Sequence, residues 1–383
     1  MNIYIDENIP YAKDFFADYG NLHFFSGRKV NAQQLIDADV LLVRSITQVN
    51  EKLLALNKKL KFVGTATIGK DHIDQDYLKN RGIAFSSAPG CNKISVAEYI
   101  LSSLFVLAEK KQFSLLQKKV AIVGAGNTGT AVYQRLNALG VNCILYDPPL
   151  EQAGDTRQFC TFDQVLSADI ISLHVPKVVQ GPFPTVHMFD HKVLSQLTSK
   201  QILLNAARGD IIDNQALLSL ARQGNAPTLV LDVWENEPNI EHLLLPYVEI
   251  ATPHIAGYSL DGRVRGTEML YQALCDFLHL KAKYSAADFV AHADINMISI
   301  AKKIDAGLMK SLMHLIFDVR RDDALFREMI EHVDGFDTMR KTYQERRELS
   351  TLTVKSSVAQ DTLLQLLGFS SNVQNETKEL HEI

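Results

Sequence analysis

Short, almost wholly hydrophobic runs alternate in this chain with longer segments whose hydrophobic residues recur at helical spacing. In the first 90 residues the hydrophobic runs fall at 2–5, 22–25, 40–43, 61–66 and 82–87. Between those runs, the hydrophobic residues near Phe15, Leu35 and Leu54 recur at helical spacing. Strands rich in β-branched residues that alternate with helices are typical of β-α-β units with buried parallel strands. This part of the chain therefore predicts a first parallel α/β domain.

A second series of the same kind follows a break at Pro89 and Gly90. A long helix is predicted to begin near Ser95, and another helix from about Asn127. The hydrophobic runs of this series fall at 120–123, 143–147, 169–175, 201–207, 228–233 and 248–254. Each is hydrophobic enough to be buried on both faces, so we expect a six-stranded doubly wound sheet.

The remaining residues complete the domain organisation. Residues 257–278 have the pattern of one more helix, long enough to return to the first domain. From about Lys281 the alternation stops, with helical stretches near 304–317 and 358–367 and a possible strand at 350–354. We therefore predict an α/β protein with two doubly wound parallel-sheet (Rossmann-like) domains and a C-terminal α+β domain. The expected boundaries are 1–94 with 255–280 for a discontinuous, flavodoxin-like domain, 95–254 for the second domain, and 281–383 for the third.

Composition favours a small-molecule ligand. The 383 residues carry a net charge of −5 and no domain-long basic block, which argues against nucleic acid or an anionic membrane as partner. The most hydrophobic long stretch, 94–108, falls short of the roughly 20 residues of a membrane span, so we interpret it as a buried helix. The four cysteines show neither zinc-ligand nor disulfide spacing, and no metal site is expected. Acidic residues near the first Met do not suit a signal peptide, so we expect a cytoplasmic protein.

A glycine pattern predicts a dinucleotide site. Gly124, Gly126 and Gly129 form G-x-G-x-x-G between the run at 120–123 and a helix, and they enclose Asn127 and Thr128. The first glycine allows a tight turn, the second lets the backbone approach a pyrophosphate, and the third lets helix and strand pack closely. The alternative is a glycine-rich turn without a ligand, which the combined strand, helix and downstream acid disfavour.

That downstream acid is Asp147, about 20 residues further on at the end of a predicted strand. A carboxylate there accepts hydrogen bonds from the adenosine ribose hydroxyls and repels the additional phosphate of NADP. Because Pro148 and Pro149 follow in place of an arginine, the sequence favours NAD as cofactor. The alternative is an Asp that only caps a turn at the strand's end.

Three polar residues follow strands of the second series, where a doubly wound sheet places its ligand crevice. They are Arg208, Glu237 and His254. An arginine can hold a substrate carboxylate with two parallel hydrogen bonds, and a histidine can accept a hydroxyl proton near neutral pH. A carboxylate beside the histidine would fix its tautomer. Each residue alone has an ordinary structural explanation, so their joint position beside a dinucleotide pattern carries the hypothesis of a 2-hydroxy acid oxidation.

Residues 1–280 resemble the D-isomer-specific 2-hydroxyacid dehydrogenase family. The likeness runs through GAGNTG, the HVP at 174–176, NAARGD, LDVWENEP and PHIAG, in the family's order. It implies a first domain that binds substrate, an inserted NAD domain, and Arg208, Glu237 and His254 as binding arginine, orienting acid and proton-transfer histidine. It also implies that four further residues line the cofactor site, namely Val175, Ala206, Asp232 and Gly257.

Within the family, VRSIT at 43–47, residues 62–74, APGCN at 88–92 and the tail motifs DVRRDD and ERRELS imply a phosphorylated 2-hydroxy acid as substrate. They also imply that Ser45, Thr67 and Tyr258 contact it, and that the tail makes a homodimer. Arg44 ends a predicted strand and is a candidate phosphate ligand. Arg346 and Arg347 could reach a phosphate in a neighbouring subunit, although a solvated helix face with Glu345 and Glu348 as charge partners is the favoured interpretation.

Two alternatives remain at this point. Phosphoglycerate dehydrogenase shares the catalytic set and a phosphorylated substrate, but the tail does not resemble the small regulatory domain often appended there. A dehydrogenase-like protein that only senses NAD could keep the same three polar residues, and it would transfer no hydride with any 2-hydroxy acid.

Overall fold

Contacts within the computed structural model, which describes residues 1–371, divide the chain into two compact units. Unit 1 is Met1–Ser95 with Gly257–Ala291, and unit 2 is Val96–Ala256 with the described residues from His292 onward. The chain thus leaves the first unit near Ser95 and re-enters it at Gly257. The C-terminal residues, expected to form a third domain, group with unit 2. We call residues 292–371 the C-terminal region.

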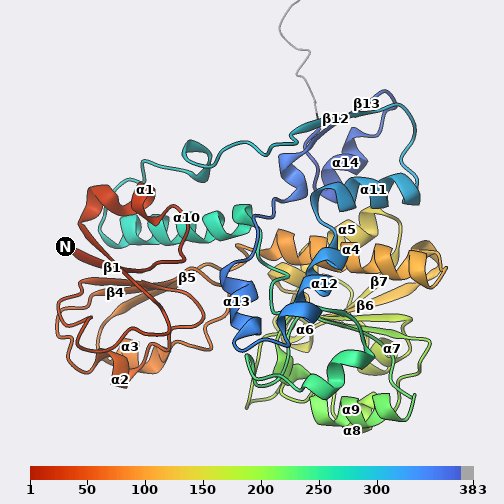
Figure 1. The fold of residues 1–383 in the computed structure, drawn as a ribbon, viewed down its shortest axis with the longest axis horizontal. Coiled ribbons are helices and arrows are strands. Elements are labelled where there is room, and N and C mark those ends of the chain that lie inside the picture. The colour runs from red at the N-terminus through yellow and green to blue at the C-terminus, as the bar shows by residue number, and fades with distance from the viewer. Residues whose placement is uncertain (372–383) are drawn as a thin grey trace, which may run out of the picture. The chain divides into compact units, whose positions relative to one another are not determined.

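Unit 1 contains a sheet of five parallel strands in the order β2-β1-β3-β4-β5, the order of flavodoxin-like folds. Figure 1 shows helices on both sides of this sheet. The strands are β1 (Asn2–Asp6), β2 (Asn21–Phe25), β3 (Val40–Val43), β4 (Phe62–Thr65) and β5 (Ala84–Ser87). In β3, Val40 and Leu42 belong to one hydrophobic cluster and Leu41 and Val43 to another. Successive residues of a strand point to opposite faces, so this strand is hydrophobic throughout because both faces are covered.

The helices of unit 1 lie on both sides of the sheet. They are α1 (Ala12–Phe16), α2 (Glu51–Leu54), α3 (Gln75–Asn80) and α10 (Leu260–Phe277), with short 3-10 turns at Ala17–Tyr19 and Ala286–Asp288. Side chains of α1 and α10 join one cluster, while Leu54 and Leu78 from α2 and α3 join the other. The helix predicted around Leu35 is wrong, because residues 32–37 form turns. The buried Asn57 amide donates to the carbonyls of Leu35 and Ala38, which supports this non-helical path.

Unit 2 contains six parallel strands in the order β11-β10-β9-β8-β6-β7. They are β6 (Lys119–Val123), β7 (Asn142–Tyr146), β8 (Ile170–Leu173), β9 (Ile202–Asn205), β10 (Thr228–Leu231) and β11 (Val248–Ala251). A single bridge from Leu145 of β7 to Phe159 adds a rudimentary seventh strand at that edge. With it, the order is that of a Rossmann dinucleotide-binding fold, and the strand order reverses at β6 and β8. The predicted doubly wound sheet is confirmed.

Six helices, α4 to α9, precede or connect the strands of this sheet, and the first of them is α4 (Lys93–Lys110). The remaining ones are α5 (Asn127–Ala138), α6 (Pro148–Gln152), α7 (Phe162–Leu166), α8 (His191–Leu194) and α9 (Asn214–Arg222), with 3-10 turns at Leu115–Gln117, Gly209–Ile211 and His242–Tyr247. The C-terminal region has the predicted mixture of helices and a small sheet. It consists of β12 (Met297–Ile300), α11 (Ala306–Ile316), α12 (Val319–Met329), α13 (Gly335–Lys341), a 3-10 turn at Leu349–Thr351, β13 (Thr353–Ser356) and α14 (Asp361–Leu367).

Helix α12 explains why the C-terminal region groups with unit 2. It lies along β11, the edge strand of the sheet, where Asp323 accepts a hydrogen bond from the Ala251 amide at 2.8 Å. Arg327 donates to the carbonyls of Leu245 and Val248. On its buried side, Phe326 packs in the cluster that covers one face of the sheet. The C-terminal region therefore continues the core of unit 2 and protects an exposed sheet edge.

Candidate active site

The turn between β6 and α5 has the geometry that the glycine pattern predicts. Gly124 has a φ of 91°, and a Cβ on it would lie 2.7 Å from the backbone of His174. A Cβ on Gly129 would lie 1.8 Å from the Gly124 carbonyl oxygen. Gly126, the N-cap of α5, has nothing within 4 Å of the corresponding position. The helix therefore starts at open space lined by backbone, which fits a pyrophosphate.

Asp147 ends β7 beside this turn. One carboxylate oxygen accepts from the Ala125 amide at 2.8 Å, and the other caps α6 by accepting from the Leu150 amide at 3.1 Å. The capping interpretation of Asp147 is thus observed. Each carboxylate oxygen has a further lone pair, so a ribose hydroxyl can still donate to it. The carboxylate also places a negative charge where NADP would carry its additional phosphate.

The other residues that the resemblance assigns to the cofactor follow successive strands. Val175 follows β8, and its amide nitrogen would lie 2.8 Å from a Cβ on Gly124. Ala206 follows β9 directly, and Asp232 follows β10 directly. These positions are at the carboxyl ends of the unit 2 strands, around the reversal of strand order. Gly257 belongs to unit 1 and is the first residue after the chain leaves unit 2.

Glu237 and His254 form a hydrogen-bonded pair. They lie in the loops after β10 and β11, which are neighbours in the sheet. The distance from His254 Nδ1 to Glu237 Oε2 is 2.7 Å, and Glu237 Oε1 accepts from the Trp234 amide at 2.9 Å. Burial raises the pKa of Glu237, but the facing His254, with Arg340 and the Trp234 amide, outweighs it and holds the pKa below its usual value. Glu237 is therefore ionised near neutral pH and accepts the proton on Nδ1, which leaves Nε2 of a neutral imidazole as a base.

Arg208 lies in the loop that follows β9. Its Nη1 donates to the Ala207 carbonyl at 2.7 Å, and Asn205 holds the loop by donating to the Arg208 carbonyl at 2.9 Å. A Cβ on Gly209 would lie 2.0 Å from the carbonyl carbon of Trp234. The loops that carry Arg208 and Glu237 therefore touch, and only glycine permits this approach.

A buried chain of hydrogen bonds behind His254 was not predicted as a unit. The Tyr99 and Thr252 hydroxyls lie 2.8 Å apart, and Thr252 donates to Asp232 at 2.7 Å. The same carboxylate accepts the amides of Ile255 and Ala256, at 2.8 and 3.0 Å. Tyr99 and Thr252 stand in hydrophobic stretches and gave no signal in the sequence, since their contact depends on how helix α4 packs against the residues after β11.

The candidate substrate ligands Arg44, Ser45, Thr67 and Tyr258 all belong to unit 1. Arg44 and Ser45 directly follow β3, and Thr67 lies just beyond β4. The guanidinium carbon of Arg44 is 5.4 Å from the centre of the Tyr258 ring, and Arg44 also donates to the Asn8 carbonyl. The hydroxyl of Thr67 donates to the Gly69 carbonyl at 2.9 Å. These residues are thus at the carboxyl ends of parallel strands, where α/β sheets bind ligands.

Arg346 is not where either interpretation placed it. It is 4% exposed, and it lies in an irregular segment and not on a solvated helix face. Glu348, expected as its exposed charge partner, is fully buried. Arg346 donates to the Ala256 carbonyl and pairs with Glu98. A side chain so enclosed does not reach a phosphate in another subunit.

Among residues 1–371 there is no group of three or more His, Cys, Asp or Glu side chains that could hold a metal ion. No helix in the same range is both long and hydrophobic enough to cross a membrane.

Comparison with known proteins defines the class. The model of the NAD binding domain of D-isomer specific 2-hydroxyacid dehydrogenases matches residues 105–256, and a domain of unknown function matches residues 289–368. A D-lactate dehydrogenase from Aquifex aeolicus, solved with NAD and lactic acid, is 26% identical with a TM-score of 0.59. The match covers 73% of this chain and 96% of that one. The fold and the matched domain define an NAD-dependent oxidoreductase of the 2-hydroxyacid dehydrogenase class.

Two relatives narrow this class. A protein from Psychromonas ingrahamii is 83% identical over 383 residues and covers 100% of both chains. One from Tolumonas auensis is 52% identical over 370 residues, which is 97% of this chain and 99% of the relative. Both are erythronate-4-phosphate dehydrogenases. The chain belongs to the erythronate-4-phosphate dehydrogenases, within the D-isomer specific 2-hydroxyacid dehydrogenase family. The predicted family, enzyme class and cofactor, NAD, are confirmed.

Proposed function

We propose that this chain oxidises the C2 hydroxyl of 4-phospho-D-erythronate to give 2-oxo-3-hydroxy-4-phosphobutanoate, a step of pyridoxal 5'-phosphate biosynthesis. The observation that carries the proposal is the full-length 83% identity to an erythronate-4-phosphate dehydrogenase. The Glu237–His254 pair lies at the same carboxyl end of the sheet as the dinucleotide turn. It supports the proposal because it is arranged for removal of a hydroxyl proton.

NAD, when bound, accepts the hydride that leaves C2 of the substrate. His254 Nε2 takes the hydroxyl proton, since Nδ1 already donates to Glu237. As the imidazole gains its charge, the Glu237 carboxylate stabilises the imidazolium at 2.7 Å. In the reverse direction the same nitrogen returns the proton to the carbonyl oxygen. His254 is thus the acid–base group and Glu237 its orienting acid.

Arg208 binds the substrate carboxylate in this proposal. A guanidinium presents several donors in one plane, so it can hold a carboxylate with two parallel hydrogen bonds. One donor of Arg208 is used on the Ala207 carbonyl, which fixes the direction of the side chain. The close approach of Gly209 to the Trp234 backbone holds the loop that carries Arg208 against the loop that carries Glu237.

For the rest of the substrate we propose Arg44, Ser45, Thr67 and Tyr258 as ligands. The Arg44 guanidinium supplies the positive charge that a phosphate requires, and the hydroxyls of Ser45 and Tyr258 are hydrogen-bond donors. The Thr67 hydroxyl, whose proton goes to the Gly69 carbonyl, can accept a hydrogen bond from a substrate hydroxyl. The cation–π contact with Tyr258 orients Arg44 within unit 1. Val175, Ala206, Asp232 and Gly257 are proposed to line the cofactor, together with residues 124–129 and Asp147.

The decisive experiment measures NADH absorbance after the protein is mixed with NAD and one of three acids: 4-phospho-D-erythronate, unphosphorylated D-erythronate or 3-phosphoglycerate. We expect the highest kcat/KM with the first. His254→Ala should lower turnover by about 10²- to 10⁴-fold while NADH still binds, which excludes a contaminating enzyme. Preference for 3-phosphoglycerate would overturn the substrate, and NADH binding without turnover of any acid would favour the sensor alternative.

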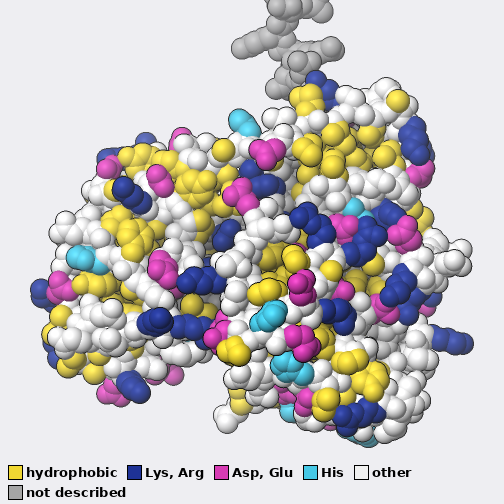
Figure 2. Space-filling model, in the orientation of Figure 1, with side chains coloured by type: hydrophobic (Ala, Val, Ile, Leu, Met, Phe, Trp, Pro, Cys, Tyr) yellow, Lys and Arg dark blue, Asp and Glu magenta, His cyan; other side chains and the backbone are white. Residues whose placement is uncertain are grey.

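We also propose a homodimer formed through the C-terminal region, in the cytoplasm. Seven of the sixteen exposed large hydrophobic residues found among residues 1–371 lie there, and Figure 2 shows hydrophobic side chains gathered on this part of the surface. They are Ile295, Met297, Leu315, Leu325, Val333, Val358 and Leu366. The outer edge of β12 also pairs with no other strand among the described residues. An unpaired strand edge beside exposed hydrophobic side chains suits a second copy of the chain. Four free cysteines agree with a reducing compartment.

A further inference from the structure

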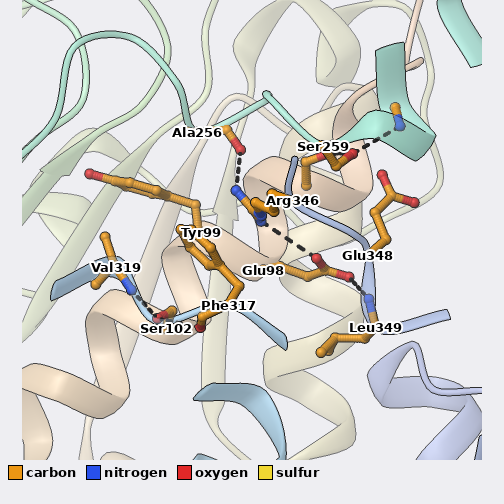
Figure 3. A network of polar contacts seen from close by, with 12 residues as sticks. Glu98, Tyr99, Ser102, Ala256, Ser259, Phe317, Val319, Arg346, Glu348 and Leu349 are labelled. Atoms are coloured by element: carbon orange, nitrogen blue, oxygen red, sulfur yellow. Dashed lines mark hydrogen bonds and ion pairs between the residues drawn. The ribbon is translucent and has the colours of Figure 1, made fainter. Parts of the chain in front are cut away.

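A cluster of buried charges joins the C-terminal region to the helix α4 and to the loop after β11 (Figure 3). Arg346 is 4% exposed, Asp322 is 1% exposed, and Glu98 and Glu348 are fully buried. Removing such groups from water is costly unless each is paired and hydrogen-bonded, and hydrophobic residues of the same size often stabilise a fold as well or better. The cluster therefore calls for an explanation beyond stability.

The contacts of Arg346 define its position closely. Its Nη1 donates to the Ala256 carbonyl at 3.1 Å, and its Nη2 lies 3.5 Å from Glu98 Oε2. Its guanidinium carbon lies 3.5 Å from the centre of the Phe317 ring. The other oxygen of Glu98 accepts from the Leu349 amide at 2.8 Å. In Figure 3 the guanidinium lies between the Ala256 carbonyl and the Glu98 carboxylate. These contacts fix the orientation of both the Arg346 guanidinium and the Glu98 carboxylate.

Ala256 ends the short segment that carries the candidate base. The His254 amide donates to the Asp232 carbonyl at 2.6 Å, and the next two amides donate to the Asp232 carboxylate. The carbonyl of Ala256 accepts from Arg346. The segment is thus held by Asp232 through its amides and by Arg346 through its last carbonyl. Directly after it, at Gly257, the chain passes into unit 1.

The conformation of His254 makes such restraint necessary. Its φ of 58° is in the left-handed region, which a histidine adopts at some cost and keeps only where its surroundings determine it. If the segment relaxed, the imidazole would rotate away from Glu237, which holds Nδ1 at 2.7 Å. A displacement of about 1 Å of a reacting group can cost ~10²-fold in rate.

We propose that Arg346, from the region that matches a domain of unknown function, is a positioning residue for His254: by fixing the Ala256 carbonyl it holds the 254–256 segment in the geometry needed for proton transfer. The C-terminal region then completes the catalytic unit of its own chain, in addition to any role in assembly. This inference rests on the proposed function, since it concerns the same reaction.

Burial raises the pKa of Glu98, with nearby Glu348 adding to the rise and Arg346 and Arg135 opposing it. An unpaired Glu98 would therefore be unfavourable, and a variant must remove both members of the pair. The double variant E98Q/R346Q does so. The control is D323N/R327Q, which neutralises a partly exposed Arg–Asp pair within helix α12 of the C-terminal region. Arg327 also donates to backbone carbonyls of unit 2, those of Leu245 and Val248, but none in the 254–256 segment.

The full-length protein is assayed with NAD and 4-phospho-D-erythronate, and the concentration of intact sites is determined by fluorescence titration with NADH. For E98Q/R346Q we expect kcat per NADH-binding site to fall about 10- to 100-fold. The kinetic isotope effect with C2-deuterated substrate should rise above that of the parent, because the chemical step becomes slower. D323N/R327Q should keep kcat per site and the isotope effect of the parent, even if its melting temperature falls.

A merely structural Arg346 would reduce the number of sites and leave kcat per site within about twofold of the parent, which overturns the proposal. If the double variant does not fold, R346K serves in its place, because one ammonium retains the charge but cannot replace both the Ala256 and the Glu98 contacts. The same criterion of kcat per site then decides. Turnover by the parent tests the proposed function separately, so failure of that function and failure of this inference are distinguishable.

Discussion

The hydrogen bond between His254 and Glu237 determines which imidazole nitrogen can act as the base. Because the pKa of Glu237 is lowered, the carboxylate is ionised and must accept, so Nδ1 donates. The same shift affects stability. The ionised carboxylate stabilises the fold at neutral pH, and this contribution is lost as the pH falls below the ordinary value of 4.5 toward the lower value in the folded protein.

Glu237→Gln tests the charge while it preserves the shape of the side chain. The amide oxygen can still accept from Nδ1, but it no longer stabilises the imidazolium electrostatically. We expect kcat to fall about 10²- to 10³-fold and the acid limb of the pH–rate profile to move to lower pH. NADH affinity should change little. A profile that keeps its acid limb in place would show that Glu237 does not act through the charge of His254.

Some site residues can be predicted from the local sequence pattern, whereas others depend on contacts between segments that are distant in the sequence. Gly124, Gly126 and Gly129 were predicted from local spacing alone, and the turn has the expected conformation, with a positive φ at Gly124. Asp232 was assigned only through the family resemblance. Its hydrogen bonds to Thr252 and to two backbone amides form because β10 and β11 are adjacent strands of the sheet. Arg346 was misjudged because the charge pattern of ERRELS is typical of a solvated face, and nothing local indicated its burial.

The buried strands were predictable because a run such as VLLV or IISL has no exposed face. The helices of the C-terminal region were harder. Helix α12 carries several charges, and its hydrophobic contacts reduce largely to Val319 and Phe326, so its sequence gave no clear prediction of a helix. It is held by tertiary contacts, namely Asp323 with Ala251 and Arg327 with two carbonyls. Such partners, distant in sequence, cannot be read from spacing.

The turn between β6 and α5 permits a test that separates folding from cofactor binding. A methyl group on Gly126 would meet nothing within 4 Å, so Gly126→Ala should melt within a few degrees of the parent. The same methyl group would occupy the space into which a pyrophosphate fits, and we expect the Kd for NADH to rise at least about tenfold. Calorimetric titration and thermal melting check both parts.

Gly307→Ala is the control, because Gly307 lies in helix α11, where a Cβ would meet only Asp305 at 3.4 Å. This variant should keep the NADH affinity of the parent. If Gly126→Ala binds NADH as tightly as the control does, the turn does not hold the dinucleotide.

Helix α12 also carries a carboxylate whose ionisation opposes folding. Burial raises the pKa of Asp322 to about 6 from an ordinary 3.8. The folded protein therefore holds this proton more tightly than the unfolded chain, so the cost of the buried charge increases as the pH rises from 3.8 and is fully present above about 6. Asp322→Asn removes this dependence and can still accept from the Tyr343 hydroxyl.

Relative to the parent, Asp322→Asn should gain about 1 kcal/mol in the free energy of unfolding between pH 5 and pH 8. Urea unfolding at the two pH values measures this difference. Glu328→Gln, on the exposed side of the same helix, should show the parent's pH dependence. Parallel pH dependence of all three proteins would mean that Asp322 is not charged at a cost in the folded state.

Two separate roles are proposed for the C-terminal region, assembly of a dimer and support of the 254–256 segment. The contacts for the second task are all within one chain, from Arg346 to Ala256 and Glu98. The surface proposed for assembly is elsewhere in the region, at the open edge of β12 and its exposed side chains. The two tasks should therefore be separable by mutation.

Met297→Glu is designed to separate them. Met297 is 48% exposed on β12, and a carboxylate there would be desolvated unpaired in a dimer interface, at a cost of several kcal/mol. Light scattering should give the parent a mass of twice the 42.8 kDa chain and the variant a mass near one chain. Leu243→Glu, at a hydrophobic residue that is 58% exposed and outside the C-terminal region, should remain dimeric.

Because Arg346 acts within its own chain, the monomeric variant should keep kcat per NADH-binding site within a few-fold of the parent. A monomeric parent would refute the dimer, and a monomeric variant that binds NADH but turns over no substrate would show that the site needs its partner.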